Sequence, residues 1–406
     1  MYYALDRDTA LDYVRQSPVI TEILGDQEDL RCVDLAEGNV NLIYRIYSDS
    51  HGGRSVLLKQ ALPHSRRYPD FKMPLERARI EYDLLQIEAN YCPDLVPKVY
   101  LYDAEMYLNV MEDLNRHIVM RYGLMKQVRY PRFASDIGTF LARTLFYTSD
   151  LHLLSVDKKA MVPRFINPVL SKVTEDLVFT QPYTFHANNR YTRLLDPQVL
   201  EIYRDDELRS EVFALKESFM ANAQALVHGD LHTGSIMVNE RETKVIDPEF
   251  AFFGPMGFDI GAVLGNLALS YASQEYHARD RGIRVAYQQW LVDTIHQLWN
   301  TFETEFRRLW ETDGNDYWPS PRFRDRYLAG LLQDAAGFGA CKMMRRILGL
   351  AHVPDLDSIP DDRDRAVCES LALNAARAWL MNRHTITSIK DLTDMLTAAK
   401  PRSPMG

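Results

Sequence analysis

One stretch of the chain, residues 227–258, decides how the rest is interpreted: VHGDLHTGSIMVNERETKVIDPEFAFFGPMGF. It contains two short runs of mainly apolar and β-branched residues, 236–238 and 244–246, joined by a polar connection, which is typical of a β-hairpin. Asp230 precedes the first run and Asp247 follows the second, so a hairpin would hold both carboxylates near one point. Phosphoryl transfer requires this layout, because one carboxylate accepts the proton of the attacking hydroxyl and another holds the magnesium that bridges the phosphates.

The motifs in this stretch resemble those of a known enzyme family. His228-Gly229-Asp230, followed by Asp247-Pro248-Glu249, is similar to the motif pair of aminoglycoside- and choline-kinase-like phosphotransferases. The longer strings HGDLHTGSIMV and KVIDPEFAFFGPMGFDIGA closely resemble the 5-methylthioribose kinases, the sugar kinases of methionine salvage. In the wider superfamily an Asn follows the catalytic Asp by five residues and binds metal. Ser235 takes that place here, as is usual in the methylthioribose branch, and a hydroxyl is a weaker magnesium ligand than an amide oxygen.

Length and composition narrow the classes of protein that fit. The 406 residues suit two or three packed units, and 46% apolar with 25% charged residues is ordinary for a globular protein. A net charge of -9 and a pI near 5.7 argue against nucleic acid as a main partner. Four scattered cysteines without a CxxC pair indicate free thiols in a reducing cytosol. The N-terminus lacks the pattern of a signal peptide, and the apolar region 251–272 contains Asp259, Asn266 and four glycines, so we expect buried core rather than a membrane span.

The first 111 residues predict a small antiparallel sheet. A helical stretch over residues 1–30, with Thr9 as a possible cap, precedes three strand-like runs between residues 30 and 61. Gly38 and Asn39 separate the first two runs; they would let the backbone approach a phosphate, although such a pair is more often only a turn. Lys59 ends the apolar run 56–59. It is either an edge lysine with its ammonium in water, or the strand lysine that pairs with the α- and β-phosphates of ATP.

A helix predicted for residues 74–89 offers acidic partners for this lysine. Glu76, Glu81 and Asp83 all lie on it, and acids on a helix are commonly just solvated. The resemblance favours Glu81. Two further strand-like runs, 96–101 and 106–111, lead into residues 112–115, which the resemblance identifies as the hinge that holds adenine; an acidic strand exit is the alternative.

The remainder of the chain, residues 116–406, predicts a mainly helical lobe. We expect helices over residues 136–147, 207–223, 286–310 and 323–350, and irregular structure over the proline-containing segment 164–205. Residues 257–261 begin a long apolar helix, and Asp259 among them is either an N-cap or a brace for the catalytic loop.

Two adjacent arginines, Arg345 and Arg346, stand on an otherwise apolar helix. Neighbouring helical residues point about 100° apart, so both cannot lie on one solvated face, and we expect one of them to point inward. A structural salt bridge would explain this. The resemblance implies instead a twin-arginine pair that binds the sugar close to the transferred phosphate.

These observations predict an α+β, two-lobed, protein-kinase-like fold, with a small antiparallel-sheet N-lobe (1–111), a hinge (112–115) and a larger, mainly helical C-lobe (116–406). The resemblance implies phosphorylation of the anomeric hydroxyl of 5-methylthioribose, with ATP and Mg²⁺, by a cytoplasmic homodimer without a nucleic-acid or membrane partner. It implies these roles: Asp230 is catalytic; ATP is bound by Gly38, Asn39, Asn41, Lys59, Glu81, Met111, Glu112 and Leu114; metal by Asp247, Glu249 and Ser235; the sugar by Asp230, Thr233, Arg345, Arg346 and Asn41; and His228 and Asp259 brace the catalytic loop.

Two alternatives stay open at this point. One is a small-molecule phosphotransferase of the aminoglycoside, choline or homoserine type, for which a cationic acceptor would need an acidic or aromatic cage. The other is a nucleotide-binding pseudokinase, favoured only by Ser235 in place of Asn and opposed by the presence of Lys59, Asp230 and Asp247.

Overall fold

The structure, a computed structural model, describes residues 2–25, 29–35, 40–48, 53–65, 72–316 and 318–401. The chain divides into two compact units. The smaller unit comprises Met1–His117, Asn167–Leu170 and Lys244–Ala251; the larger unit comprises Ile118–Ile166, Ser171–Thr243 and Phe252–Gly406. Two short segments that the sequence-based division placed in the larger lobe therefore pack with the smaller unit.

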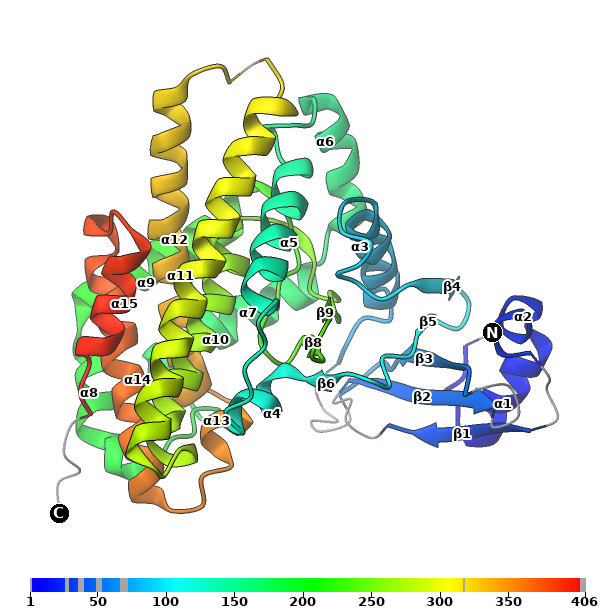
Figure 1. Cartoon of the computed structure of the whole chain (residues 1–406), viewed down its shortest axis with the longest axis horizontal. Coiled ribbons are helices and arrows are strands. Elements are labelled where there is room, and N and C mark those ends of the chain that lie inside the picture. The colour runs from blue at the N-terminus through cyan, green and yellow to red at the C-terminus, as the bar shows by residue number, and fades with distance from the viewer. Residues whose placement is uncertain are drawn as a thin grey trace. The chain divides into compact units, whose positions relative to one another are not determined.

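The smaller unit is built on a five-stranded antiparallel sheet in the order β1-β2-β3-β5-β4. Its strands are β1 (Leu30–Asp34), β2 (Asn41–Ser48), β3 (Ser55–Ala61), β4 (Val99–Asp103) and β5 (Leu108–Glu112). Helices α1 (Arg7–Gln16) and α2 (Pro18–Leu24) lie beside the sheet, and α3 (Arg77–Tyr91) packs against β3, β4 and β5 (Figure 1). The side chains of alternate β3 residues, Val56 and Leu58, enter the core with α1 and α2, as the two-residue period of a strand requires.

The N-terminal helical stretch differs from the prediction in two details. It is two helices, because Pro18 cannot continue α1 and instead occupies the first turn of α2. The N-cap of α1 is Asp6 rather than Thr9: the Asp6 side chain accepts from the Thr9 backbone amide, and the Thr9 hydroxyl accepts from the Asp6 amide, each at 2.8 Å.

The larger unit is mainly helical. Its long helices are α5 (Phe133–Tyr147), α9 (Asp206–Ala221), α10 (Met256–His277), α11 (Arg281–Thr312), α12 (Pro321–Leu348) and α14 (Asp362–Asn382), and α5 and α11 lie side by side (Figure 1). Its shorter elements are β6 (Ile118–Val119), α4 (Met120–Met125), α6 (Ser155–Met161), α8 (Asp196–Arg204), β7 (Ala225–Val227), β8 (Ile236–Val238), β10 (Phe252–Gly254), α13 (Pro354–Asp357) and α15 (Ile389–Ala398). The division between the units falls within α7 (Pro168–Phe179) and β9 (Thr243–Val245). The combination of an antiparallel-sheet unit with a helical unit confirms the predicted α+β class.

The expectation of irregular structure over residues 164–205 is wrong, because α7 and α8 occupy much of this segment. Pro168 is the first residue of α7, and Pro197 lies in the first turn of α8. Proline is favourable there, since the first turn of a helix leaves its amides without intrahelical partners. The prolines begin these helices rather than interrupt them.

Glycines let α10 and α12 pack at very short range. A Cβ atom at Gly261 would lie 2.4 Å from the carbonyl oxygen of Ala335, and one at Gly265 would lie 2.7 Å from that of Gly339. These distances are below van der Waals contact, so side chains larger than hydrogen would force the helices apart. The two helices are thereby held in one fixed arrangement.

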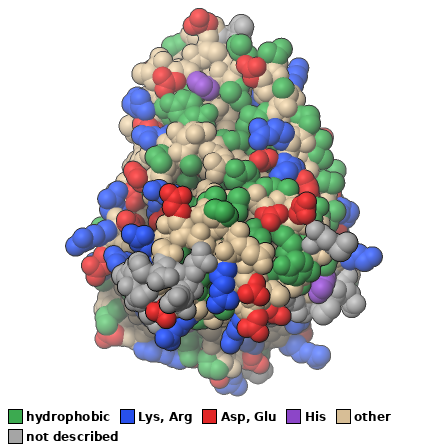
Figure 2. Space-filling model, turned by 90° about the vertical axis from the view of Figure 1, so that its right-hand side faces the viewer, with side chains coloured by type: hydrophobic (Ala, Val, Ile, Leu, Met, Phe, Trp, Pro, Cys, Tyr) green, Lys and Arg blue, Asp and Glu red, His purple; other side chains and the backbone are tan. Residues whose placement is uncertain are grey.

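The surface charges and the polarity of the helices can be compared with the composition of the sequence. On the face drawn in Figure 2, Lys and Arg side chains are interspersed with Asp and Glu. Across the residues that the structure describes, we find no helix with both the length and the apolar character needed to span a bilayer.

Candidate active site

The loop after β7 carries His228, Gly229 and Asp230, and the start of α10 holds it. The Asp259 carboxylate accepts hydrogen bonds from the backbone amides of His228 (2.6 Å) and Gly229 (3.1 Å). Gly229 has φ +85°, a left-handed conformation that favours glycine. Burial raises the pKa of Asp259, and His228 opposes this effect. Asp259 therefore has the contacts that a brace of this loop requires.

Asp230 is contacted on both carboxylate oxygens. Its Oδ1 accepts from Lys342 Nζ at 3.0 Å and lies 3.7 Å from Arg345 Nη2, while its Oδ2 lies 3.3 Å from His232 Nε2. Burial by itself would raise the pKa of Asp230, but Lys342, His232 and Arg345 together hold it well below its usual range. The carboxylate is thus ionised and held in place from two sides.

The backbone fixes the tautomer of His232. The Gly234 amide donates to His232 Nδ1 at 2.9 Å, so Nδ1 is an acceptor and the ring proton belongs on Nε2, toward Asp230. Burial lowers the pKa of His232 to about 4, and Asp230 only partly opposes this. A Cβ atom at position 234 would lie 2.7 Å from the His232 ring and 2.8 Å from Arg121 Nη1, so only glycine fits there. His232 is therefore a neutral donor to the carboxylate.

Two hydroxyls of the same loop bond to the protein. The Ser235 hydroxyl donates to the backbone carbonyl of Asp230 at 3.1 Å and lies 3.4 Å from His232 Nδ1. The Thr233 hydroxyl donates to Asn266 Oδ1, on α10, at 3.4 Å. In these contacts Ser235 and Thr233 shape the loop.

Both arginines of the pair are buried, whereas the sequence predicted that one of them would point inward. Arg345 and Arg346 are each 7% exposed. Arg345 faces Asp230, and its Nε has no hydrogen-bond partner among the described residues. Arg346 Nη1 donates to the carbonyl of Ala351 at 3.2 Å. Burial lowers the pKa of both guanidinium groups, Arg346 more strongly because Arg345 adds to the effect.

The buried basic groups outnumber their acidic partners. Counted over the residues that the structure describes, the site contains four of them, Arg121, Lys342, Arg345 and Arg346, against three carboxylates, Asp230, Asp259 and Asp355. Asp355 lies 2.8 Å from Arg121 Nε, and the backbone amides described above already occupy Asp259. A buried surplus of positive charge is costly, so this site fits a ligand with an anionic group.

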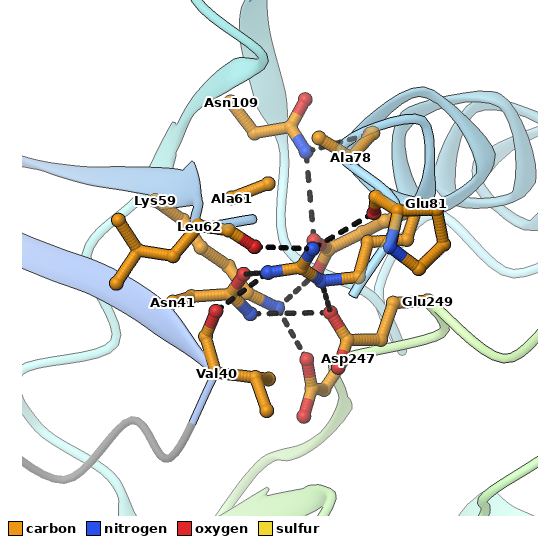
Figure 3. Close-up of polar contacts among 12 residues, drawn as sticks. Val40, Asn41, Lys59, Ala61, Leu62, Ala78, Glu81, Asn109, Asp247 and Glu249 are labelled. Atoms are coloured by element: carbon orange, nitrogen blue, oxygen red, sulfur yellow. Dashed lines mark hydrogen bonds and ion pairs between the residues drawn. The ribbon is translucent and has the colours of Figure 1, made fainter. Parts of the chain in front are cut away.

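A second cluster lies in the smaller unit, around Lys59 (Figure 3). Lys59 stands in an inner strand, opposite Ile43 of β2 and Asn109 of β5, which excludes the edge-lysine alternative. Its Nζ lies 2.6 Å from Glu81 Oε1 and also pairs with Asp247. Burial opposes protonation of Lys59, but Asp247, Glu81 and Glu249 outweigh it and raise the pKa above its ordinary value.

Of the three acidic residues predicted as partners of Lys59 in the α3 region, two bind another residue and one faces Lys59. Glu76 and Asp83 both bind Arg79, at 2.5 and 2.7 Å. Glu81 is buried and faces Lys59, and burial raises its pKa against the opposing effect of Lys59. Its place on the inner face of α3 sets it apart from the other two.

Arg77 connects the parts of this cluster. It is completely buried, and it donates to Glu249 Oε2 (3.1 Å), Asn41 Oδ1 (2.9 Å) and the carbonyls of Val40 (2.5 Å) and Leu62 (2.9 Å). Asn41 Nδ2 also donates to Glu249 Oε2, at 3.2 Å. The base of the predicted phosphate loop is thereby tied to the segment that follows Asp247.

Asp247 has the features of a residue placed for a ligand. Its φ is +70°, an unfavourable conformation for a residue with a side chain, and its side chain is 42% exposed. Mg²⁺ is typically held by one or two carboxylates together with phosphates and water, so these oxygen donors fit it. Glu249 has one oxygen, Oε2, engaged by Arg77 and Asn41. Among the described residues, no cluster of three or more His, Cys, Asp or Glu side chains forms a ready metal cage.

The remaining residues predicted to bind ATP lie either outside the described residues or at and just after the end of β5. Gly38 and Asn39 lie outside the described residues. Met111 and Glu112 end β5, where the Glu112 amide donates to the Lys98 carbonyl at 2.8 Å, and the Leu114 carbonyl accepts from the His117 amide at 2.9 Å.

Sequence reasoning missed several residues of both clusters, chiefly Lys342, His232, Arg121, Asp355 and Arg77. Lys342 left a signal, because it precedes Arg345 by three residues and so lies on the same face of the helix. Arg77 left none, since it stands among other charged residues of a helix.

The chain is similar in sequence to a phosphotransferase family and to several methylthioribose kinases. The family described as "Phosphotransferase enzyme family" matches residues 32–310. Methylthioribose kinase 1 of Oryza sativa subsp. japonica is 42% identical over 95% of this chain and 93% of its own. Methylthioribose kinases of Geobacillus kaustophilus (41%, over 90% of each chain) and Yersinia enterocolitica (39%, over 96% of this chain and 97% of its own) are similar as well.

Proposed function

Because this chain belongs to the phosphotransferase enzyme family and, within it, to the methylthioribose kinases, we propose that it transfers the γ-phosphoryl group of ATP to the anomeric hydroxyl of 5-methylthioribose. The product is 5-methylthioribose 1-phosphate, an intermediate of methionine salvage. The observation that carries the proposal is Asp230, an ionised carboxylate beside a buried surplus of basic groups.

The contacts of Asp230 suggest how it acts. The sugar hydroxyl donates to the carboxylate, which orients the hydroxyl oxygen toward the phosphorus atom. As the new O–P bond forms and the bond to the leaving ADP breaks, the proton passes from the hydroxyl to Asp230. A carboxylate with a lowered pKa is a weak base, so the proton moves late, as suits a loose transition state in which little nucleophilic push is needed.

Arg345 and Arg346 supply the complementary charge. Arg345, whose buried Nε has no hydrogen-bond partner among the described residues, would donate to the acceptor or its new phosphate, and the surplus positive charge would stabilise the negative charge on the transferred group. Thr233 would contribute to the same sugar site through its hydroxyl. A cationic acceptor such as choline or an aminoglycoside would meet repulsion here, which favours the neutral thiosugar over these alternatives.

The cluster around Lys59 is proposed to bind ATP. Lys59 would contact the α- and β-phosphates, Glu81 would hold Lys59 in place, and Asn41 would lie at the base of the phosphate loop. Asp247 would hold Mg²⁺, with Glu249 contributing the oxygen that Arg77 does not occupy. When bound, Mg²⁺ neutralises charge on the β- and γ-phosphates. We further propose, on the resemblance alone, that Ser235 assists the metal, that Met111, Glu112 and Leu114 hold adenine, and that the protein is a cytoplasmic homodimer.

The direct test is ATP consumption by the purified chain with 5-methylthioribose, beside choline, kanamycin and homoserine. We expect magnesium-dependent turnover with the thiosugar alone. Asp230→Ala should lower kcat by about 10²- to 10⁴-fold, the usual contribution of a general base, with ATP affinity almost unchanged. Turnover only with another acceptor would refute the substrate. No turnover with any of them would favour the pseudokinase, and near-normal rates for Asp230→Ala would refute its role.

A further inference from the structure

Among the described residues, Lys342 is the basic side chain closest to Asp230. Its Nζ lies 3.0 Å from Asp230 Oδ1, nearer than Arg345 at 3.7 Å, and its side chain is only 3% exposed. The same ammonium lies 4.3 Å from the centre of the buried Phe258 ring, a cation–π distance. The ammonium is thus fixed between an aromatic face and the carboxylate.

One helix, α10, contacts both the loop of Asp230 and the side chain of Lys342. Its residue Asp259 binds the loop that carries Asp230, and its residue Phe258 lies under the Lys342 ammonium. The glycine contacts at Gly261 and Gly265 hold α12, and with it Lys342, at a fixed distance from α10. The position of the ammonium relative to the carboxylate is therefore set by two rigid helices rather than by a flexible loop.

We propose that Lys342 is a positioning residue for phosphoryl transfer, which fixes the Asp230 carboxylate by binding its Oδ1, so that Oδ2 accepts the substrate hydroxyl beside its contact with His232. The inference rests on the proposed function and adds a role distinct from that of the arginine pair. Arg345 and Arg346 act on the sugar and its phosphate, whereas Lys342 acts through Asp230.

The charges around Lys342 are consistent with this role. Asp230 faces it from the catalytic loop, Asp259 from α10, and Arg345 and Arg346 from its own helix. Burial, together with the two arginines, lowers the pKa of Lys342 to about 8, although Asp230 opposes the shift. At neutral pH the ammonium is protonated, and an opposite charge at this distance typically lowers the pKa of a carboxyl group by 1–3 units.

The test compares Lys342→Met, which keeps the length and loses the charge, with Lys342→Arg, which keeps the charge. Lys159→Met, at an exposed position, is the matched control. We expect Lys342→Met to lower kcat by about 10²-fold or more while the KM values for ATP and thiosugar change less than threefold, as for an interaction realised in the transition state. Lys342→Arg should recover part of this loss, and Lys159→Met should leave kcat unchanged.

The readout that separates positioning from mere packing is the acid limb of the kcat/KM–pH profile. Without the Lys342 charge the pKa of Asp230 rises, so this limb should move upward by about one pH unit or more. An unshifted limb, or a kcat for Lys342→Met within threefold of wild type, would overturn the proposal.

A second measurement needs neither substrate nor turnover. In protein labelled with ¹³C at the aspartate carboxyl groups, the signal missing from Asp230→Asn identifies Asp230, and its titration is followed in wild type, Lys342→Met and Lys342→Gln. The midpoint should be higher in both variants, and equal midpoints would refute the inference. If wild type shows no turnover with the thiosugar, the proposed function fails while this titration still decides the Lys342–Asp230 coupling.

Discussion

The close packing of α10 against α12 predicts opposite effects for two chemically identical substitutions. A Cβ atom added at Gly261 would lie 2.4 Å from the Ala335 carbonyl oxygen and 2.6 Å from the Gly339 amide nitrogen. Both neighbours are backbone atoms, so the helices themselves must separate by about 1 Å to reach normal contact. Gly330 is also within a helix, α12, but nothing lies within 4 Å of an added Cβ atom there.

The magnitudes follow from this geometry. Replacing a helical glycine by alanine gains about 0.5–1 kcal/mol, because the unfolded chain loses backbone freedom. Gly330→Ala should show that gain. At Gly261 the same gain is opposed by an overpacking cost of about 1–3 kcal/mol. The unfolding free energy of Gly261→Ala should therefore be lower than that of Gly330→Ala by about 1–3 kcal/mol.

Differential scanning calorimetry and urea titration of wild type and both variants provide the measurement. Gly261→Ala should also lower kcat by up to about 100-fold, because a displacement near 1 Å moves Lys342 and Arg345 away from Asp230. The reasoning is refuted if Gly261→Ala unfolds at or above the midpoint of Gly330→Ala.

Three further predictions concern Asp247, His232 and Lys59. Asp247→Asn and Asp247→Ala should both lose magnesium-dependent turnover. Asp247→Ala should be about 1 kcal/mol less stable than Asp247→Asn, because Asn tolerates φ +70°; equal melting temperatures of the two variants would contradict this. The difference in unfolding free energy between wild type and His232→Asn should fall by about 3 kcal/mol from pH 7 to pH 4. The pKa of His232 is about 4 in the folded protein and near 6.5 in the unfolded chain, so the unfolded chain takes up the proton first. A difference that stays constant with pH would disprove this prediction. Lys59→Met should raise the KM for ATP at least about tenfold and leave the KM for thiosugar within twofold, since Lys59 contacts Glu81 and Asp247 and is proposed to bind phosphate; initial rates at varied ATP check this, and an unchanged ATP KM would count against the assignment.

The sequence was informative wherever a local pattern determines the structure. The α+β class followed from periodicity, and the strand position of Lys59 followed from its apolar run. The prediction was wrong around Pro168 and Pro197, because proline is found both after the ends of helices and in their first turns.

Contacts between distant parts of the chain could not be predicted in the same way. Lys342 and Asp230 are 112 positions apart, and helical spacing shows which face Lys342 shares with Arg345 but not what that face contacts. Arg77 and Glu249 are 172 positions apart, and each is an ordinary charged residue in its own segment. Their roles depend on which elements become neighbours, and a single sequence does not contain that information in any local pattern.

The smaller unit is assembled from three separate pieces of the chain, and this affects how it can form. Residues 1–117 supply Lys59 and Arg77, but the carboxylates of Asp247 and Glu249 come from the third piece, 244–251, and Asn167 of the second piece donates to the Glu249 carbonyl at 2.9 Å. During synthesis on the ribosome, Arg77 therefore cannot pair with Glu249 until most of the protein has been made. A fragment that stops at residue 117 would lack the carboxylate of Glu249 that pairs with the buried Arg77, so an isolated N-terminal fragment is a poor substitute for the whole chain in nucleotide-binding experiments.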